Sequence, residues 1–151
     1  MFSPKSLLRH PGVISPVKDF VKGSFQEVID DATVTAKDVK KVVLCSGKVY
    51  YDLLEAQLKK KAKDVAIVRL EQLHPFPEKQ VGAILKKYKN ARFAWMQEEP
   101  ANMGCLSYII RMMPEQKLEF ISRKPSASPA TGYNKVHKAE QEKIVSQALE
   151  V

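Results

Sequence analysis

The sequence predicts an α/β fold with a mostly parallel sheet, and two observations support this prediction. From residue 39 onward, short apolar runs alternate with amphipathic stretches in the order strand, helix, repeated four times. The first three runs are apolar throughout, which is typical of parallel strands covered by helices on both faces. Right-handed helical crossovers between such strands give a doubly wound sheet around one core.

Four strands are expected, at residues 42–45, 65–68, 93–96 and 118–121. The last run differs from the others because Glu119 stands between Leu118 and Phe120. Alternation of this kind places successive side chains on opposite faces, one of them less covered than the other. We therefore expect the fourth strand near an edge of the sheet.

Four helices are expected, at residues 48–62, 77–89, 104–113 and 136–149. In the first, Tyr50, Leu54 and Leu58 recur every four residues, which places them on one helix face. Pro77 suits the first helical position of the second helix, and Pro114 ends the third.

The first 38 residues are predicted to form an extended strap rather than a second domain. Several Pro and Gly residues interrupt any periodicity there, and only residues 17–29 could hold a short helix, broken at Gly23. Such a segment has too little apolar surface for a core of its own. We expect it to pack on the domain formed by residues 39–151, or to be the end of a larger protein.

Composition narrows the class of protein. The chain has 151 residues, 44% of them hydrophobic, and no apolar run approaches the roughly 20 residues that a membrane span needs. No secretory signal precedes the first proline. Cys45 and Cys105 have none of the spacings used for zinc or a redox dithiol, so a soluble domain in a reducing compartment is expected.

The formal net charge of +8 raises the question of a nucleic-acid partner. The lysines, however, gather where the predicted helices end, and there cations complement the helix dipole. No interleaved aromatic residues or basic tail accompany them. We expect no nucleic-acid binding and keep two alternatives, a polyanionic small molecule and an acidic protein surface. These lysines are Lys59, Lys60, Lys61, Lys63, Lys86, Lys87 and Lys89.

Polar residues follow each predicted strand. Since ligands of open parallel sheets collect outside the carboxyl ends of the strands, these residues are the candidates for a site. Opposite charges that meet there hold each other ionised, which suits a salt-bridged docking surface or an anion site better than acid catalysis. The segments are Ser46-Gly47-Lys48, residues 69–75, residues 97–100 and residues 122–124.

The turn Ser46-Gly47-Lys48 has two interpretations. A phosphate-binding loop of nucleotide triphosphatases needs a second glycine that is missing here. Either Ser46 caps the following helix in a tight turn, or Ser46 or Lys48 contacts an anion at the helix start.

No complete catalytic constellation is present in the sequence. His10, His74 and His137 have no metal-ligand spacing, and Ser126 and Ser128 lie in a proline-rich stretch without a nucleophile-elbow pattern. We expect that stretch to be a fixed extended loop. By itself the chain resembles a part of a larger protein.

Five blocks, in order, closely resemble the carboxyl-terminal region of the E1 component of 2-oxoglutarate dehydrogenase. Together they span the chain from Phe2 to the last helix, whereas His74, Met103 and Cys105 depart from the pattern of that family. The blocks are SPKSLLRHP (3–11), CSGKVYYDLL (45–54), VAIVRLEQLHPFP (65–77), QEEPANMG (97–104) and RKPSASPATGYNKVH (123–137).

The resemblance implies a transketolase-type carboxyl-terminal domain, a three-layer α/β/α sandwich. In the whole enzyme, two preceding domains bind thiamine diphosphate and magnesium. The enzyme oxidatively decarboxylates 2-oxoglutarate in the tricarboxylic acid cycle and passes the succinyl group to the lipoyl arm of the E2 succinyltransferase. The Gly-Asp-Gly cofactor motif of the family is absent here. The chain is therefore expected to be an excised, non-catalytic fragment without bound cofactor, substrate or metal.

In this family the region helps to build the E1 homodimer and borders a site where some members bind acetyl-CoA or AMP as effectors. The resemblance thus implies a structural and regulatory domain from bacterial cytoplasm or the mitochondrial matrix. A stand-alone module that binds an adenine nucleotide or acyl-CoA is the alternative. The residues predicted to contact an anion or a neighbouring domain are Lys5, Arg9, Ser46, Lys48, Arg69, Glu98 and Arg123. Ion pairing of Arg69 and Glu98 without a ligand role is the competing interpretation.

Overall fold

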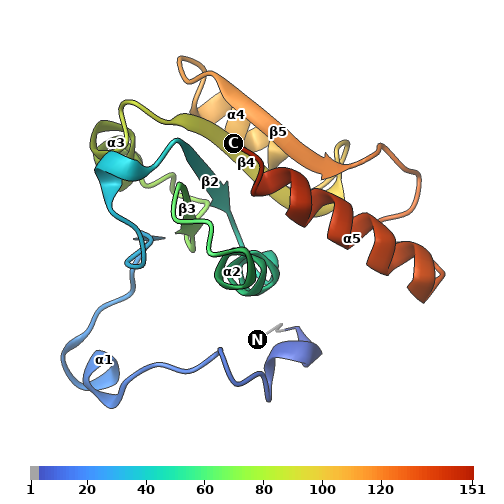
Figure 1. The fold of residues 1–151 in the computed structure, drawn as a ribbon, viewed down its shortest axis with the longest axis horizontal. Coiled ribbons are helices and arrows are strands. Elements are labelled where there is room, and N and C mark those ends of the chain that lie inside the picture. Colours follow the sequence, from blue (N-terminus) through green and yellow to red (C-terminus); the bar gives the residue numbers. More distant parts are fainter. Residues whose placement is uncertain (1–3) are drawn as a thin grey trace.

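The computed structural model describes residues 4–151. Their centre is a five-stranded sheet with the spatial order β1-β3-β2-β4-β5 (Figure 1), in which the last four strands along the chain run parallel. The predicted α/β class and the edge position of the last strand are confirmed. The strands are β1 (Val28–Ile29), β2 (Lys41–Cys45), β3 (Val65–Leu70), β4 (Arg92–Pro100) and β5 (Leu118–Arg123).

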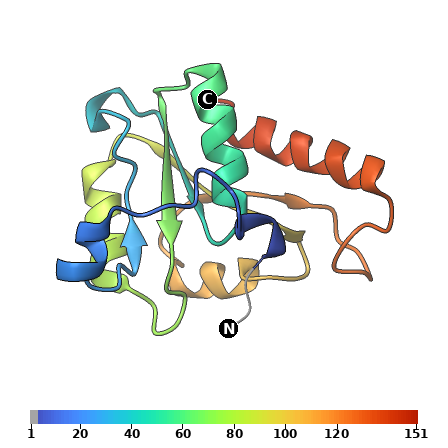
Figure 2. The same cartoon turned by 90° about the horizontal axis from the view of Figure 1, so that it is seen from below.

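Helices cover both faces of the sheet and complete three layers (Figure 2). One core cluster joins α3 and α4 to one face, and a second joins α2 and α5 to the other. None of the helices in the described part of the chain is long and apolar enough to cross a membrane. The helices are α1 (Val17–Lys22), α2 (Val49–Lys60), α3 (Glu78–Lys87), α4 (Leu106–Met112) and α5 (Asn134–Ala148), with single 3-10 turns at Lys5–Leu7 and Ala36–Asp38.

Alternate residues of the central strand divide between the two cores. Val42 and Leu44 belong to the cluster with α3 and α4, whereas Val43 and Cys45 belong to the cluster with α2 and α5. All four side chains have no exposed surface. Apolar residues at positions 42–45 of β2 are therefore required by burial on both sides, as the sequence predicted.

The predicted interruption of the 17–29 helix at Gly23 is confirmed, but no helix follows it, so the helical prediction for the second half is wrong. α1 ends at Lys22, and Val28 and Ile29 form β1, which pairs antiparallel with Leu70 and Arg69 of β3. Glu27 carbonyl oxygen also accepts hydrogen bonds from the backbone N–H groups of the two residues after β3. Pairing with an open strand edge, a tertiary interaction, overrides the local helical pattern.

The buried face of α2 also differs from the prediction. Leu58 is 61% exposed, and the buried residues are Val49, Leu53 and Gln57. The Gln57 side-chain amide donates to the Val65 carbonyl oxygen at 2.7 Å and to Asp31 at 2.9 Å. A polar residue replaces the expected leucine in the core because its donors have partners there.

Asp31 fastens the segment before β2 to the sheet. Its carboxylate accepts hydrogen bonds from Ile67 N–H at 3.0 Å, from Gln57 and from Thr33. Burial alone would raise the pKa of Asp31, but the hydrogen bonds from Thr33, Gln57 and Ile67 outweigh it and lower the pKa below its ordinary value. This carboxylate therefore stays ionised in the folded protein.

Lys41, at the start of β2, is buried with 2% of its side chain exposed. Its ammonium donates to the carbonyl oxygens of Gln147 at 3.1 Å and Glu150 at 3.0 Å, and pairs with Glu119 at 3.0 Å. The lysine thereby ties the carboxyl-terminal end of α5 to the sheet and supplies donors to carbonyl oxygens at and just beyond the end of this helix.

Candidate functional site

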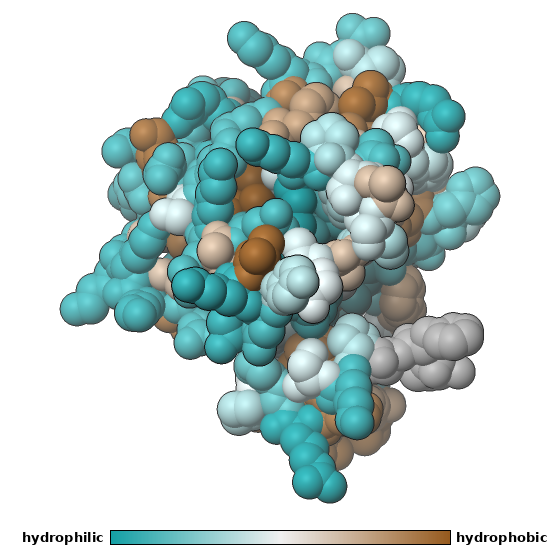
Figure 3. Space-filling view, turned by 90° about the vertical axis from the view of Figure 1, so that its right-hand side faces the viewer, coloured by the Kyte–Doolittle hydropathy of each residue, from teal (hydrophilic) through white to brown (hydrophobic). Residues whose placement is uncertain are grey.

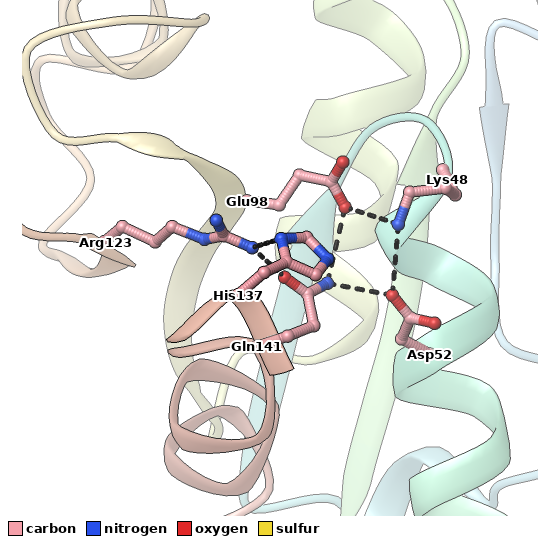
Figure 4. A network of polar contacts seen from close by, with 6 residues as sticks. All are labelled: Lys48, Asp52, Glu98, Arg123, His137 and Gln141. Carbon is pink, nitrogen blue, oxygen red and sulfur yellow. Dashed lines mark hydrogen bonds and ion pairs between the residues drawn. The ribbon is translucent and has the colours of Figure 1, made fainter. Parts of the chain in front are cut away.

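The candidate site lies at the topological switch point of the sheet. The chain leaves β2 for β3 on one side and later returns to form β4 on the other side of β2. At such a point the connections diverge, and the carboxyl ends of the strands border a crevice. Figure 4 shows the polar network that fills this position, with side chains from the β2–α2 turn, α2, β4, β5 and α5.

The turn after β2 places Lys48 in this network. Gly47 has a φ of +77°, a conformation that L side chains rarely adopt, so the glycine permits the sharp change of direction. The helix begins at Val49, Lys48 occupies the cap position, and no side chain caps the helix. The interpretation of Ser46 as the helix cap is therefore wrong, because Ser46 lies two residues too early to reach the first turn.

Lys48 lies between two carboxylates. Its ammonium is 2.8 Å from Glu98 and 3.4 Å from Asp52. Burial by itself would lower the pKa of Lys48, but the hydrogen bond and charge of Glu98, followed by those of Asp52, raise it above the ordinary value. The lysine is thus firmly charged, and its charge is already compensated by two protein groups.

Gln141 connects this ion pair to Arg123. Its amide nitrogen donates to Asp52 at 2.8 Å and to Glu98 at 3.3 Å, while its amide oxygen accepts from the Arg123 guanidinium at 2.7 Å. Arg123 also contacts His137 Nδ1 at 3.1 Å. One side chain of α5 therefore bridges the ends of β4 and β5 and the start of α2 (Figure 4).

Arg123 is the most buried cation of this cluster, with 6% of its side chain exposed. Besides Gln141 and His137, the guanidinium faces Glu140 at 3.5 Å. Its Nε has no hydrogen-bond partner within residues 4–151. Arg123 is consequently held in position but is not fully satisfied.

Arg69 belongs to a separate cluster. Its guanidinium pairs with Glu71 at 2.8 Å and lies over the ring of Tyr50, 4.4 Å from the centroid, and 5.7 Å from the centroid of Tyr51. Such stacking is worth about 1 kcal/mol. The ion-pair and hydrogen-bond partners of Arg69 are not shared with Lys48 or Arg123, so the single rim expected from the sequence divides into two clusters.

Lys5 and Arg9 are exposed and make no ion pair within the described residues. They lie in the amino-terminal segment, whose His10 packs against Tyr51 with ring centroids 5.5 Å apart. The segment therefore approaches the Arg69 cluster rather than the Lys48 cluster. Ser46 is partly buried in its turn.

Sequence reasoning missed Asp52, His137 and Gln141. Asp52 carried a usable signal, because it stands four residues after Lys48 in a helical pattern, where opposite charges meet. Gln141 carried none, since its contacts depend on how α5 crosses the ends of β4 and β5.

Chemically, the cluster is a closed set of ion pairs. Each carboxylate of the Lys48 cluster faces a cation or an amide donor. Within residues 4–151 no group of three His, Cys, Asp or Glu side chains could hold a metal ion. His74 is exposed, and its nearest polar partner is the Tyr108 hydroxyl at 3.4 Å. The arrangement can fix elements and present charge, but it offers no nucleophile paired with a base.

Comparison with a solved structure supports the fold. The chain resembles an inactive β4 tetramer of a split-gene transketolase with a TM-score of 0.51 and 14% identity, over 73% of this chain and 38% of that one. The architecture is therefore the transketolase type of α/β domain.

The sequence comparisons define the family. The family model described as 2-oxoglutarate dehydrogenase C-terminal matches residues 14–149, and the chain belongs to this family. Relatives include the 2-oxoglutarate dehydrogenase E1 components of Haemophilus influenzae (47% identical over 97% of this chain) and Cupriavidus necator (46%, 99%). A mitochondrial 2-oxoglutarate dehydrogenase of Caenorhabditis elegans is 44% identical over the whole chain. The chain spans only 16% of the length of each of these three relatives.

Proposed function

We propose that the chain acts as the carboxyl-terminal structural and regulatory domain of a 2-oxoglutarate dehydrogenase E1. The observation that carries this proposal is the match of nearly the whole chain to one short region of much longer E1 relatives. In this role the chain takes part in oxidative decarboxylation of 2-oxoglutarate and succinyl transfer to E2 without contributing a catalytic residue. The same match favours this role over a stand-alone nucleotide or acyl-CoA binding module.

Thiamine diphosphate and magnesium are proposed to bind outside this chain. The residues present do not fit them: magnesium prefers oxygen ligands, and the two carboxylates that approach each other, Asp52 and Glu98, share the ammonium of Lys48 between them. A cation is thus already supplied by the protein at that position. We derive no step of the reaction through either group.

Residues 1–38 are proposed to be a strap rather than a domain. The early part of this strap is proposed to lie against the preceding domains of E1. Large apolar side chains there are between 66% and 82% exposed, an arrangement more typical of an interface than of free surface. Their burial would couple this chain to the rest of the enzyme and its homodimer. They are Leu8, Ile14, Val17, Phe20, Val21 and Phe25.

The proposed interface is tested in the full-length enzyme. Phe20→Asp with Val21→Asp should speed cleavage of the segment in limited proteolysis and lower the yield of assembled dimer, because charges would enter an apolar contact. Lys18→Asp on the same short helix is the matched control. Equal proteolysis of all three proteins would contradict the role of this segment.

The regulatory part of the proposal concerns the cations at the strand ends. Of these, Arg69 is the better test, because Arg123 also holds the network of α5 in place. Arg69→Ala in the full-length enzyme should weaken the response to acetyl-CoA or AMP more than it lowers turnover. Tyr50→Leu, which removes only the stacking partner, is the control. Loss of all activity in Arg69→Ala would instead indicate a role in folding or domain docking.

A further inference from the structure

A cavity of about 350 Å³ lies between the 124–133 loop and the amino-terminal end of α5. The loop that forms its outer wall is fixed: Asn102 donates to the Ser126 carbonyl oxygen at 2.9 Å and accepts from Ser126 N–H at 3.0 Å. A volume of this size accommodates a small metabolite. The lining includes Arg123, Lys124, Thr131, Tyr133, Val136 and Glu140.

Two buried polar atoms of the lining residues have no hydrogen-bond partner within residues 4–151. They are Nε of Arg123, a residue only 8% exposed, and Oγ1 of Thr131. A buried polar atom without a partner costs about 1–3 kcal/mol. Since a guanidinium N–H can only donate, the partner missing at Arg123 is an acceptor oxygen.

The start of α5 has the opposite charge pattern from the one that helices favour. No side chain caps the helix, and its first turn contains no acidic residue. Lys135 and Lys138 instead stand second and fifth in the helix. The amino-terminal end carries a partial positive charge and N–H groups without helical partners, so cations there are unfavourable and an anion is stabilised.

The cations around this cavity are also the least compensated ones near the strand ends. Lys124 makes no ion pair within the described residues, and Arg123 has one carboxylate, at 3.5 Å. Lys48 pairs with two carboxylates, and Arg69 with Glu71 at 2.8 Å. Figure 3 shows the side of the molecule that carries the loop and the start of α5, where the surface is mostly hydrophilic and hydrophobic groups form small separate patches. Such a surface suits a small polar ligand.

We propose that this cavity binds the phosphate group of a small molecule, held by Arg123, Lys124 and the free N–H groups of the first turn of α5. The ring of Tyr133 and the side chain of Val136 line the space for the rest of the molecule. Neither Lys48 nor Arg69 lines the cavity, and Arg123 is the residue that the cavity shares with the network of Figure 4. Arg123 links the cavity to Gln141 and thus to Glu98.

The test is a titration of the 151-residue chain with inorganic phosphate at constant ionic strength, followed by thermal unfolding and amide NMR. Phosphate should raise the Tm saturably, with the largest amide shifts in residues 134–136. Lys124→Gln and Lys135→Glu should each weaken binding about tenfold. Lys135→Glu should also raise the Tm without phosphate, because it complements the helix dipole, so lost binding is not confused with lost folding.

Lys59→Gln, an exposed lysine in the last turn of α2, is the matched control and should bind as the unmodified chain does. A nucleoside monophosphate is titrated in parallel: tighter binding than inorganic phosphate identifies an organic phosphate as ligand, and equal binding identifies free phosphate. Equal affinity in all variants, or equal stabilisation by sodium chloride, would overturn the proposal. The assay involves no turnover, so its failure is distinguishable from failure of the proposed E1 role.

Discussion

The two ends of α5 are both held by a buried cation, yet the two cations are in different states. At the carboxyl-terminal end, the Lys41 ammonium faces two carbonyl oxygens and one carboxylate, all within 3.1 Å. At the amino-terminal end, Arg123 has several partners but keeps an unpartnered Nε beside a cavity. A fully satisfied buried charge indicates a structural contact, whereas a partly satisfied one next to open space indicates a place for a ligand.

The largest effect is expected when the contact between Lys41 and the carboxyl-terminal end of α5 is broken. Lys41→Met keeps the length of the side chain and removes its charge, leaving the end of α5 and Glu119 without their donor. We expect the free energy of unfolding to fall by about 3 kcal/mol in urea denaturation. Lys40→Met is the control: its pair with Asp64 is 3.5 Å long and its side chain is 69% exposed, so about 0.5 kcal/mol or less is expected. Similar losses of unfolding free energy in the two variants would contradict the structural role of Lys41.

Arg123→Met tests the opposite end. We expect a smaller loss, about 2 kcal/mol, because Arg123 already carries an unpartnered N–H whose cost disappears with the side chain. Urea denaturation measures it alongside Lys41→Met. A loss equal to or larger than that of Lys41→Met would show that the contrast between the ends is absent.

The pH dependence of stability should distinguish Asp31, which anchors the segment before β2, from the two cations at the ends of α5. The folded pKa of Asp31 lies below its ordinary 3.8, so its contribution is fully present above that value and is lost as the pH falls through the folded pKa. Asp31→Asn should cost about 1.5 kcal/mol at pH 7 and lose less stability between pH 5 and pH 2 than the unmodified chain. Asp64→Asn, at an exposed pair, is the control. Parallel acid curves for all three proteins would contradict this role of Asp31.

The smallest expected effect concerns Gln141, which connects the Lys48 ion pairs to Arg123. Gln141→Leu keeps a side chain of similar size but removes the hydrogen bonds to Asp52, Glu98 and Arg123. We expect a loss of about 1 kcal/mol in urea denaturation, because the Lys48 pairs remain. Gln147→Leu at the other end, where only the backbone of that residue is bonded to Lys41, should be near neutral. A neutral Gln141→Leu would mean that the network does not couple α5 to the strand ends.

Much of the fold could be predicted from the sequence, because burial on both faces leaves a local trace. The continuous apolar runs located β2, β3 and β4, and the alternating run located the edge strand β5. β1 left no such trace, since two residues are too short for a period and the partner strand lies about forty residues away. The same reason explains why Gln141 was missed, whereas Lys48 and Arg123 were found because they follow predicted strands; β5 itself extends to Arg123.

The pairing of β1 with β3 has a consequence for handling the protein. β3 would otherwise offer a row of unpaired N–H and C=O groups to any neighbouring molecule, and such rows promote intermolecular strand pairing. The backbone of Glu27, Val28 and Ile29 covers the carboxyl-terminal end of this row, from Arg69 onward. A shortened chain that begins after Ile29 would uncover it and should precipitate or form oligomers during purification, whereas one that begins a few residues before Glu27 should remain monodisperse.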